Sequence, residues 1–183
     1  MAAAHRAISL DPESARAHQV MMNVLYARGD AATALAVGKK AVSLNPYDTI
    51  VLTSYAIRLL WSGDVDQAMA LLQRAADYGP GQPQFLYFAL FVGAYSRGDD
   101  AGAAQYANLL ASDSYAYGLA ARAIVAARTG QPDAARRAIH KLVQLSPAWR
   151  ENARLEIARY GAPPDIAARM ASDLDAAGIR ADN

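Results

Sequence analysis

The sequence contains no cysteine among its 183 residues. This absence excludes disulfide bonds, thiolate zinc sites and cysteine nucleophiles, although reducing and oxidising compartments both tolerate it. No run of about 18 apolar residues occurs either, so no membrane span is expected. His5 and Arg6 stand where a secretory signal would need its apolar region, and we therefore expect a cytoplasmic protein.

An excess of charge of one sign is also lacking. The formal net charge is +1, which gives no broad attraction for nucleic acid or anionic lipid. We interpret the basic pairs Lys39-Lys40 and Arg136-Arg137 as solvated helix faces. The composition, 54% hydrophobic and 19% charged, is enough to bury a sizeable core. We therefore expect a globular chain that binds no nucleic acid directly.

Side chains for catalysis are sparse and scattered. His5, His18 and His140 lie far apart, and none has a second histidine or a carboxylate at metal-ligand spacing. Glu151 and Glu156 are five residues apart and would diverge around a helix, which disfavours a paired acid and base. We therefore expect that the protein is not an enzyme and that it has no catalytic residue, no metal and no cofactor.

What the sequence does contain is a repeat. Ala7–Pro12 is echoed by Ala41–Pro46 at an offset of 34 residues, and Pro80 follows at the same interval. A fixed period of this size marks a stacked array whose units cannot bury their apolar faces alone. A turn also recurs between these marks, as Arg28-Gly29-Asp30, Ser62-Gly63-Asp64, Arg97-Gly98-Asp99 and Thr129-Gly130-Gln131. We interpret the two Arg-Gly-Asp triplets as helix ends and caps, not as adhesion motifs.

The pattern predicts one domain over residues 1–183, with a partial repeat at 1–12, four repeats at 13–147, and a C-terminal helix pair with a tail at 148–183. Asp11 is expected to cap the first full helix, from about Glu13 to Arg28, on which Val20 is expected to face the core. Asp64 and Gln67 predict a capping box. Asp30 is expected to cap the second helix of the first full repeat, which carries Ala34 to Val42. Further helices are expected at 2–9, 49–62, 64–75, within 84–112, within 114–145, at 148–159 and at 165–177.

The last helix is expected to cap the stack. Ile166, Met170 and Leu174 form an apolar stripe toward the array, while Arg169, Asp173 and Asp175 are expected to face water.

The array resembles the tetratricopeptide repeat. The first repeat departs from the family pattern at Gly38, where a bulky residue belongs, and the third lacks the closing proline. The likeness implies an all-α right-handed superhelix of antiparallel helix pairs, with about four full repeats. The second repeat matches the pattern best, through Leu52, Tyr55, Ala56, Leu59, Ala68, Leu72, Ala75 and Pro80.

A weaker likeness lies at the C-terminus. The proline-led helix that ends in Ala176-Ala177-Gly178-Ile179 is similar to the close of repeat regions in multidomain bacterial signalling proteins, downstream of a nucleotide cyclase or a winged-helix DNA-binding domain.

The resemblance implies a protein-interaction scaffold that binds a peptide in the concave groove lined by the first helix of each pair. The alternative is that many of these side chains are core. A second apolar set on the same helices, which includes Leu52, Leu90 and Leu119, already fills the positions between helices and favours the groove. The family's groove positions select Asn23, Tyr26, Ile50, Ile57, Trp61, Phe85, Phe88, Val92, Tyr95, Tyr117 and Ile124.

The family's carboxylate clamp is incomplete in this sequence. Asn23 matches one clamp position, but the others fall on Gln19, Ser54, Phe85 and Ala89, which carry no charge. We therefore expect an apolar or amphipathic peptide or helix as partner. The alternative is a homodimerisation, intramolecular docking or sensor module of a larger cyclase or winged-helix regulator.

Overall fold

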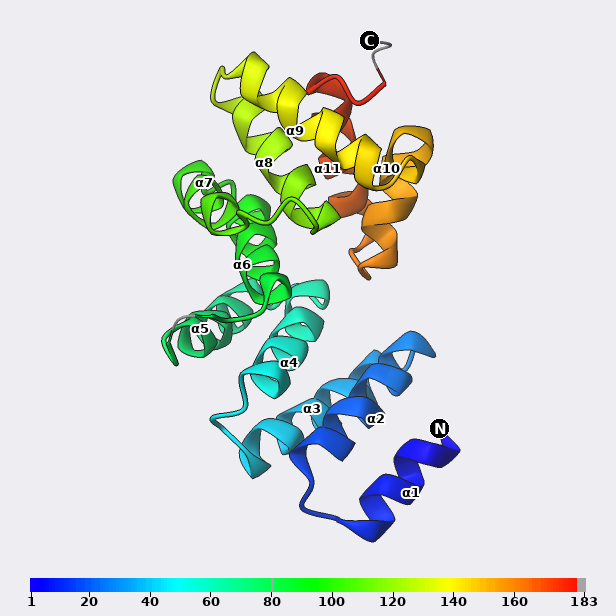
Figure 1. The fold of residues 1–183 in the computed structure, drawn as a ribbon. Helices are drawn as coiled ribbons and strands as arrows, with labels where there is room; N and C mark the ends of the chain where they lie inside the picture. Colours follow the sequence, from blue (N-terminus) through cyan, green and yellow to red (C-terminus); the bar gives the residue numbers. More distant parts are fainter. Residues whose placement is uncertain (80, 181–183) are drawn as a thin grey trace. The chain divides into compact units, whose positions relative to one another are not determined.

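The computed structural model describes residues 1–79 and 81–180, and this part of the chain is all-helical. The prediction of an all-α fold built from consecutive helix pairs is confirmed (Figure 1). Pro80, predicted to close the second repeat, lies outside the described residues. The helices are α1 (Ala2–Leu10), α2 (Ala15–Ala27), α3 (Ala31–Leu44), α4 (Thr49–Trp61), α5 (Val65–Ala76), α6 (Gln84–Arg97), α7 (Asp100–Leu109), α8 (Ala116–Arg128), α9 (Pro132–Leu145), α10 (Ala148–Arg159) and α11 (Pro164–Ala176).

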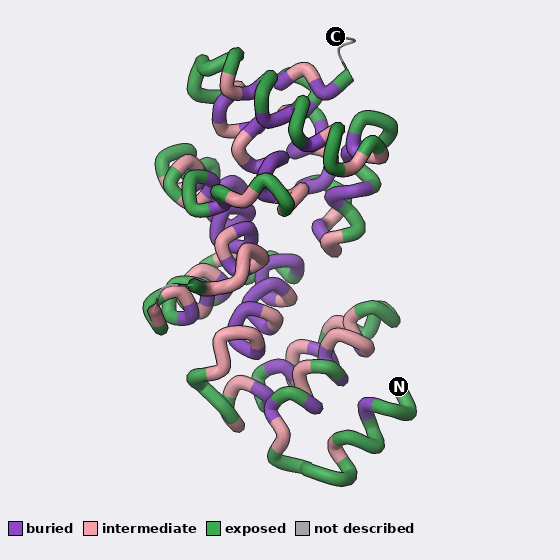
Figure 2. Tube along the Cα trace, in the orientation of Figure 1, coloured by how far each residue is buried: buried purple, intermediate pink, exposed green. Residues whose placement is uncertain are grey.

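The chain divides into two compact units, residues 1–82 and residues 83–183. In the first unit, α2 pairs with α3 and α4 with α5, and α1 packs against α2. In the second, α6 pairs with α7, α8 with α9 and α10 with α11. Figure 2 shows the buried residues concentrated on α4, α6 and α8, while α1 is mostly exposed. A single domain over residues 1–183 stays a prediction.

Aspartates begin four of these helices by accepting a hydrogen bond from a backbone N–H one turn ahead, which satisfies a donor that the helix itself leaves unpaired. Asp30 accepts from Thr33 at 3.2 Å, and Asp99 accepts from Gly102 at 2.9 Å. Asp48 and Asp64 do the same for α4 and α5. The periodic turn therefore sets the boundaries of most helix pairs.

Two predicted details at helix starts are wrong. The cap of α2 is Ser14, whose Oγ accepts from the Ala17 N–H at 3.3 Å, because Asp11 instead accepts from the Glu13 N–H in a local turn. The capping box at Asp64 is half formed. Gln67 donates its backbone N–H to the Asp64 carboxylate, but the Asp64 N–H is already bonded to the Leu59 carbonyl at 3.0 Å.

The apolar stripe of α2 is narrower than predicted. Val20 was expected to face the core, but it is 47% exposed. Ala17, Met21 and Leu25 are buried at steps of four residues, so they form the stripe and Val20 lies beside it.

Gly38 on α3 occupies a close contact between successive repeats. A Cβ atom at this position would lie 2.5 Å from the Met22 sulfur and 2.5 Å from Cδ2 of Tyr55. The Tyr55 ring, from the next helix pair, is buried and takes the space that a bulky residue at position 38 would fill. The departure from the repeat pattern at Gly38 is therefore matched by Tyr55.

Candidate binding faces

The first helices of the two pairs in the first unit share a row of half-buried polar and aromatic side chains. Gln19 donates its amide to Ser54 Oγ at 3.2 Å. One turn further along, Arg58 Nη2 donates to Asn23 Oδ1 at 3.3 Å. In both bonds the residue on α4 lies 35 residues after its partner on α2. The two helices therefore present equivalent positions in register.

Tyr26 continues this row, with the Arg58 guanidinium 4.7 Å from its ring centroid in a cation–π contact. Ile50, at the start of α4, is half-buried as well. We call this surface the α2–α4 face, made of Gln19, Asn23, Tyr26, Ile50, Ser54 and Arg58.

Arg58 is the residue of this face that the sequence analysis missed. The expectation of an uncharged groove came from the clamp positions alone, and Arg58 lies one turn beyond Ser54. Its 35-residue separation from Asn23 is a sequence signal that could have found it. The α2–α4 face therefore carries a positive charge within a largely uncharged row.

Two predicted groove residues of α4 lie deeper. Ile57 and Trp61 are each 8% exposed, which places them mainly in the packed interior. Thr53, between them and Ile50, is fully buried and donates its hydroxyl to the Thr49 carbonyl at 2.6 Å. These three side chains leave little surface for a ligand in this arrangement.

In the second unit, the first helices α6 and α8 are covered by the C-terminal helices of the same chain. Phe88 is fully buried, and its ring centroid lies 4.7 Å from that of Tyr160 in an edge-on contact. Tyr117 lies 5.1 Å from both of these rings, and 5.4 Å from Trp149. Aromatic rings at these separations pack favourably.

Hydrogen bonds extend the same contact. The Tyr160 hydroxyl donates to the Phe85 carbonyl at 3.2 Å, and the Tyr117 hydroxyl donates to the Glu156 carbonyl at 3.1 Å. Burial raises the pKa of Tyr117, and the Glu156 carboxylate raises it further, so the hydroxyl keeps the proton that it donates.

Tyr95, near the end of α6, joins α11 through a charged cluster. Its hydroxyl donates to Asp173 Oδ2 at 2.9 Å, and Arg128 Nη1 donates to the same oxygen at 3.2 Å. Arg169 lies 4.9 Å from the Tyr95 ring centroid. Burial raises the pKa of Tyr95, and the bond to Asp173 adds to the shift, so the neutral phenol is favoured.

This cluster corrects one expectation about the last helix. Ile166, Met170 and Leu174 are buried as predicted. Arg169 and Asp175 are exposed as predicted, although the Arg169 guanidinium also lies over the Tyr95 ring. The expectation is wrong for Asp173, which is half-buried and accepts a hydrogen bond from Tyr95. Asp173 therefore joins α11 to α6 within the second unit.

The backbone of α10 bends at Asn152, where the prediction had one uninterrupted helix. Asn152 has non-helical dihedral angles (φ −154°, ψ 76°), and its side chain accepts from the Leu155 N–H at 3.0 Å. Asn152 thus caps a second helical segment. Trp149 precedes the bend, and Glu156 and Tyr160 follow it, so both sides of the bend reach Tyr117 or its neighbours.

We call the first-helix surface of the second unit the α6–α8 face. Val92 and Ile124, predicted for the same groove, are almost fully buried within this unit. Four of the six predicted residues here are contacted by α10, by Tyr160 at its end, or by α11. The face comprises Phe85, Phe88, Val92, Tyr95, Tyr117 and Ile124, and the contacted four are Phe85, Phe88, Tyr95 and Tyr117.

Comparison with known proteins agrees with this repeat geometry. A family model of the tetratricopeptide repeat matches residues 25–88, which run from the end of α2 into α6. Residues 25–88 are therefore similar to the tetratricopeptide repeat. No protein of curated function matches the chain.

Solved structures, two of which are of TPR proteins, share the fold. YrrB, a TPR protein with an unusual peptide-binding site, is 16% identical, with a TM-score of 0.66 over 96% of this chain and 92% of that one. PilF of Pseudomonas aeruginosa is 20% identical, with a TM-score of 0.72 over 94% and 80%. TTC0263, a thermophilic TPR protein of Thermus thermophilus, is 22% identical, with a TM-score of 0.63 over 92% and 93%. At these identities the likeness concerns the fold.

Residues 1–79 and 81–180 contain neither a candidate metal site nor a candidate membrane span. No group of three or more His, Asp or Glu side chains there is arranged to hold a metal ion. None of the helices there is long and apolar enough to cross a membrane.

Proposed function

We propose that this protein is an interaction scaffold whose α2–α4 face binds a segment of a partner protein. The observation that carries the proposal is the in-register row of half-buried polar and aromatic side chains on the first helices of two successive repeats. Gln19 with Ser54 and Asn23 with Arg58 hold each other in fixed geometry, which lowers the entropy cost of binding.

The chemistry of the row indicates what the segment carries. The Arg58 guanidinium favours a carboxylate from the partner, and the exposed parts of Tyr26 and Ile50 favour an apolar side chain beside it. An amphipathic peptide or helix with one acidic residue next to an apolar one satisfies both. This sharpens the sequence-based expectation of an apolar or amphipathic partner.

For the second unit we propose a different occupant. The residues predicted for its groove are contacted by α10, Tyr160 and α11, so the chain's own C-terminal helices take the place that a partner would have. The contacts of Phe88 with Tyr160 and of Tyr95 with Asp173 support this. It is the intramolecular alternative raised from the sequence. A homodimer and a cytoplasmic location stay predictions.

Selection from a random peptide library displayed on phage tests the proposal. Peptides enriched on the full chain are expected to share an acidic residue adjacent to an apolar one. Their affinity should fall at least tenfold for Arg58→Glu, because a carboxylate would then face another carboxylate. Fluorescence anisotropy with a labelled peptide gives the affinity, and circular dichroism confirms that the variant is folded.

Lys40→Glu is the matched control. It makes the same change of charge as Arg58→Glu, but at an exposed residue of α3 away from the α2–α4 face. Its peptide affinity should stay within about twofold of the wild type. Equal affinities for Arg58→Glu and Lys40→Glu, or a library with no enriched peptide, would refute the assignment of the α2–α4 face.

A further inference from the structure

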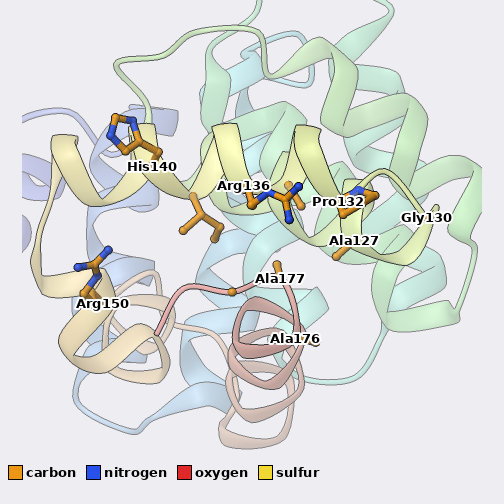
Figure 3. A pocket seen from close by; sticks show the side chains of 11 residues that line it. Ala127, Gly130, Pro132, Arg136, His140, Arg150, Ala176 and Ala177 are labelled. Carbon is orange, nitrogen blue, oxygen red and sulfur yellow. The ribbon is translucent and has the colours of Figure 1, made fainter. Parts of the chain in front are cut away.

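A cavity of about 510 Å³ lies in the second unit, between α9 and the end of α11. Figure 3 shows Ala176 and Ala177 across from α9, with Gly130 and Pro132 near one end and Arg150 near the other. Ligand pockets in proteins commonly have volumes of about 300–1,000 Å³, so this cavity has room for a small molecule. None of its residues belongs to the α2–α4 face or the α6–α8 face.

The walls of this cavity combine apolar surface with nitrogen-bearing side chains. Ile139 and the methyl groups of Ala127, Ala135 and Ala177 supply the apolar part. Among residues 1–79 and 81–180, the polar side chains in the lining are those of Arg136, His140 and Arg150, with no aspartate or glutamate.

Positive charge is concentrated along this side of α9. Arg137 and Lys141, together with Arg136 and His140, line an adjoining cavity of about 280 Å³. The whole chain has a formal net charge of only +1, so this cluster is a local feature. Its potential favours an anion at the mouth of the larger cavity.

The carboxylates near the cluster leave this charge largely available. Asp133 forms an ion pair with Arg136, but the two side chains are 76% and 68% exposed, and exposed pairs of this kind contribute little. Asp113 pairs with Lys141, which does not line the larger cavity. Within residues 1–79 and 81–180, Arg150 forms no ion pair.

We propose that this cavity binds a small organic anion, with one carboxylate on a short apolar body. The carboxylate binds Arg150, whose guanidinium group suits planar oxyanions, and Arg136 further along the lining adds to the positive potential. The apolar body packs against Ile139 and Ala177. The ligand is thus recognised by both ends, which distinguishes it from an inorganic ion and from a neutral hydrocarbon.

Isothermal titration calorimetry of the full chain tests the site with three probes of one series. Octanoate carries both features, octanol lacks the charge, and acetate lacks the apolar body. Octanoate is expected to bind at least tenfold more tightly than either control. Equal binding of octanol, equal binding of acetate, or no octanoate binding at millimolar concentration would overturn the proposal.

Variants locate the binding. Arg150→Ala should weaken octanoate binding about tenfold. Arg154→Ala changes an exposed arginine four residues further on, beyond the bend of α10 and outside the lining, and should leave the affinity within about twofold. Ala176→Phe should block the cavity without changing charge. Its control is Ser172→Phe, which adds the same ring at an exposed position of α11 outside the lining.

Circular dichroism checks that each variant is folded. If the members of either pair reduce affinity equally, octanoate does not bind in this cavity and the proposal is wrong. Should Ala176→Phe fail to fold, the arginine pair decides alone.

Discussion

The first-helix surfaces of the two units differ in how deeply their side chains are buried. On the α2–α4 face, side chains such as Asn23 and Tyr26 are half-buried and pair with one another across repeats. On the α6–α8 face, Phe88 and Tyr95 are buried and contact the chain's own C-terminal helices. The same position in a repeat can therefore stay half-buried or join the core, and the difference depends on what the chain places over it.

The largest expected difference between the faces is in stability. Phe88→Ala should lower the free energy of unfolding by about 3–5 kcal/mol, because it leaves a cavity among Tyr115, Tyr117 and Tyr160. Tyr26→Ala should lower it by no more than about 1 kcal/mol, because the ring is half exposed and loses mainly its contact with Arg58. Urea unfolding followed by circular dichroism measures both. Similar losses would remove the distinction between the two faces.

A smaller effect is expected for the charged cluster between α6 and α11. Asp173→Ala removes the acceptor for Tyr95 and Arg128, and should cost about 1–3 kcal/mol. Amide hydrogen exchange in α11 should accelerate accordingly.

Asp175→Ala is the control for this cluster, because its exposed ion pair with Arg180 should contribute no more than about 1 kcal/mol. If the two aspartate variants exchange at the same rate, the contact of α11 with Tyr95 does not hold the C-terminal helices in place.

The smallest effect is expected at alkaline pH. Because burial and then Asp173 raise the pKa of Tyr95 above its ordinary value of about 10, the neutral phenol stabilises the folded state fully below about pH 10. That contribution is lost as the pH rises above this value. Tyr95→Phe should therefore lose less stability between pH 8 and pH 11 than the wild type.

Burial also raises the pKa values of Tyr115 and Tyr117. Both residues remain in the Tyr95→Phe variant, so the variant should still lose part of its stability at alkaline pH. Tyr47→Phe, at an exposed residue of the first unit, should keep the whole wild-type loss. Urea midpoints at the two pH values give the comparison. If the wild type loses no more stability between pH 8 and pH 11 than Tyr95→Phe does, Tyr95 is not stabilised as a buried neutral phenol.

Much of the fold could be predicted because its signals are local. The glycine of each periodic turn ends one helix, and an aspartate such as Asp30 or Asp99 caps the next within three residues. The prediction at Asp11 was wrong because Ser14 competes for the same role three residues later. Local alternatives of this kind move a boundary but leave the helix in place.

The candidate faces could be predicted only in part. The two apolar sets of α6 predict one packed side and one side of a groove, whereas the helix is buried from Leu86 to Tyr95 apart from Tyr87. The apolar pattern could not indicate that Tyr160 covers Phe88, because an aromatic ring packs with any apolar neighbour and the contact spans 72 positions of sequence. The bend at Asn152 is equally hidden, since asparagine is common in helices and caps alike.

The contact at Gly38 means that the repeats of this chain are not interchangeable parts. Transplanting the first repeat beside a neighbour without Tyr55 would leave a hole at the glycine, and restoring a bulky residue at 38 would collide with the tyrosine that is there. Neither repeat can therefore change alone. An engineered array that is shortened, lengthened or reordered must keep Gly38 and Tyr55 in adjacent repeats.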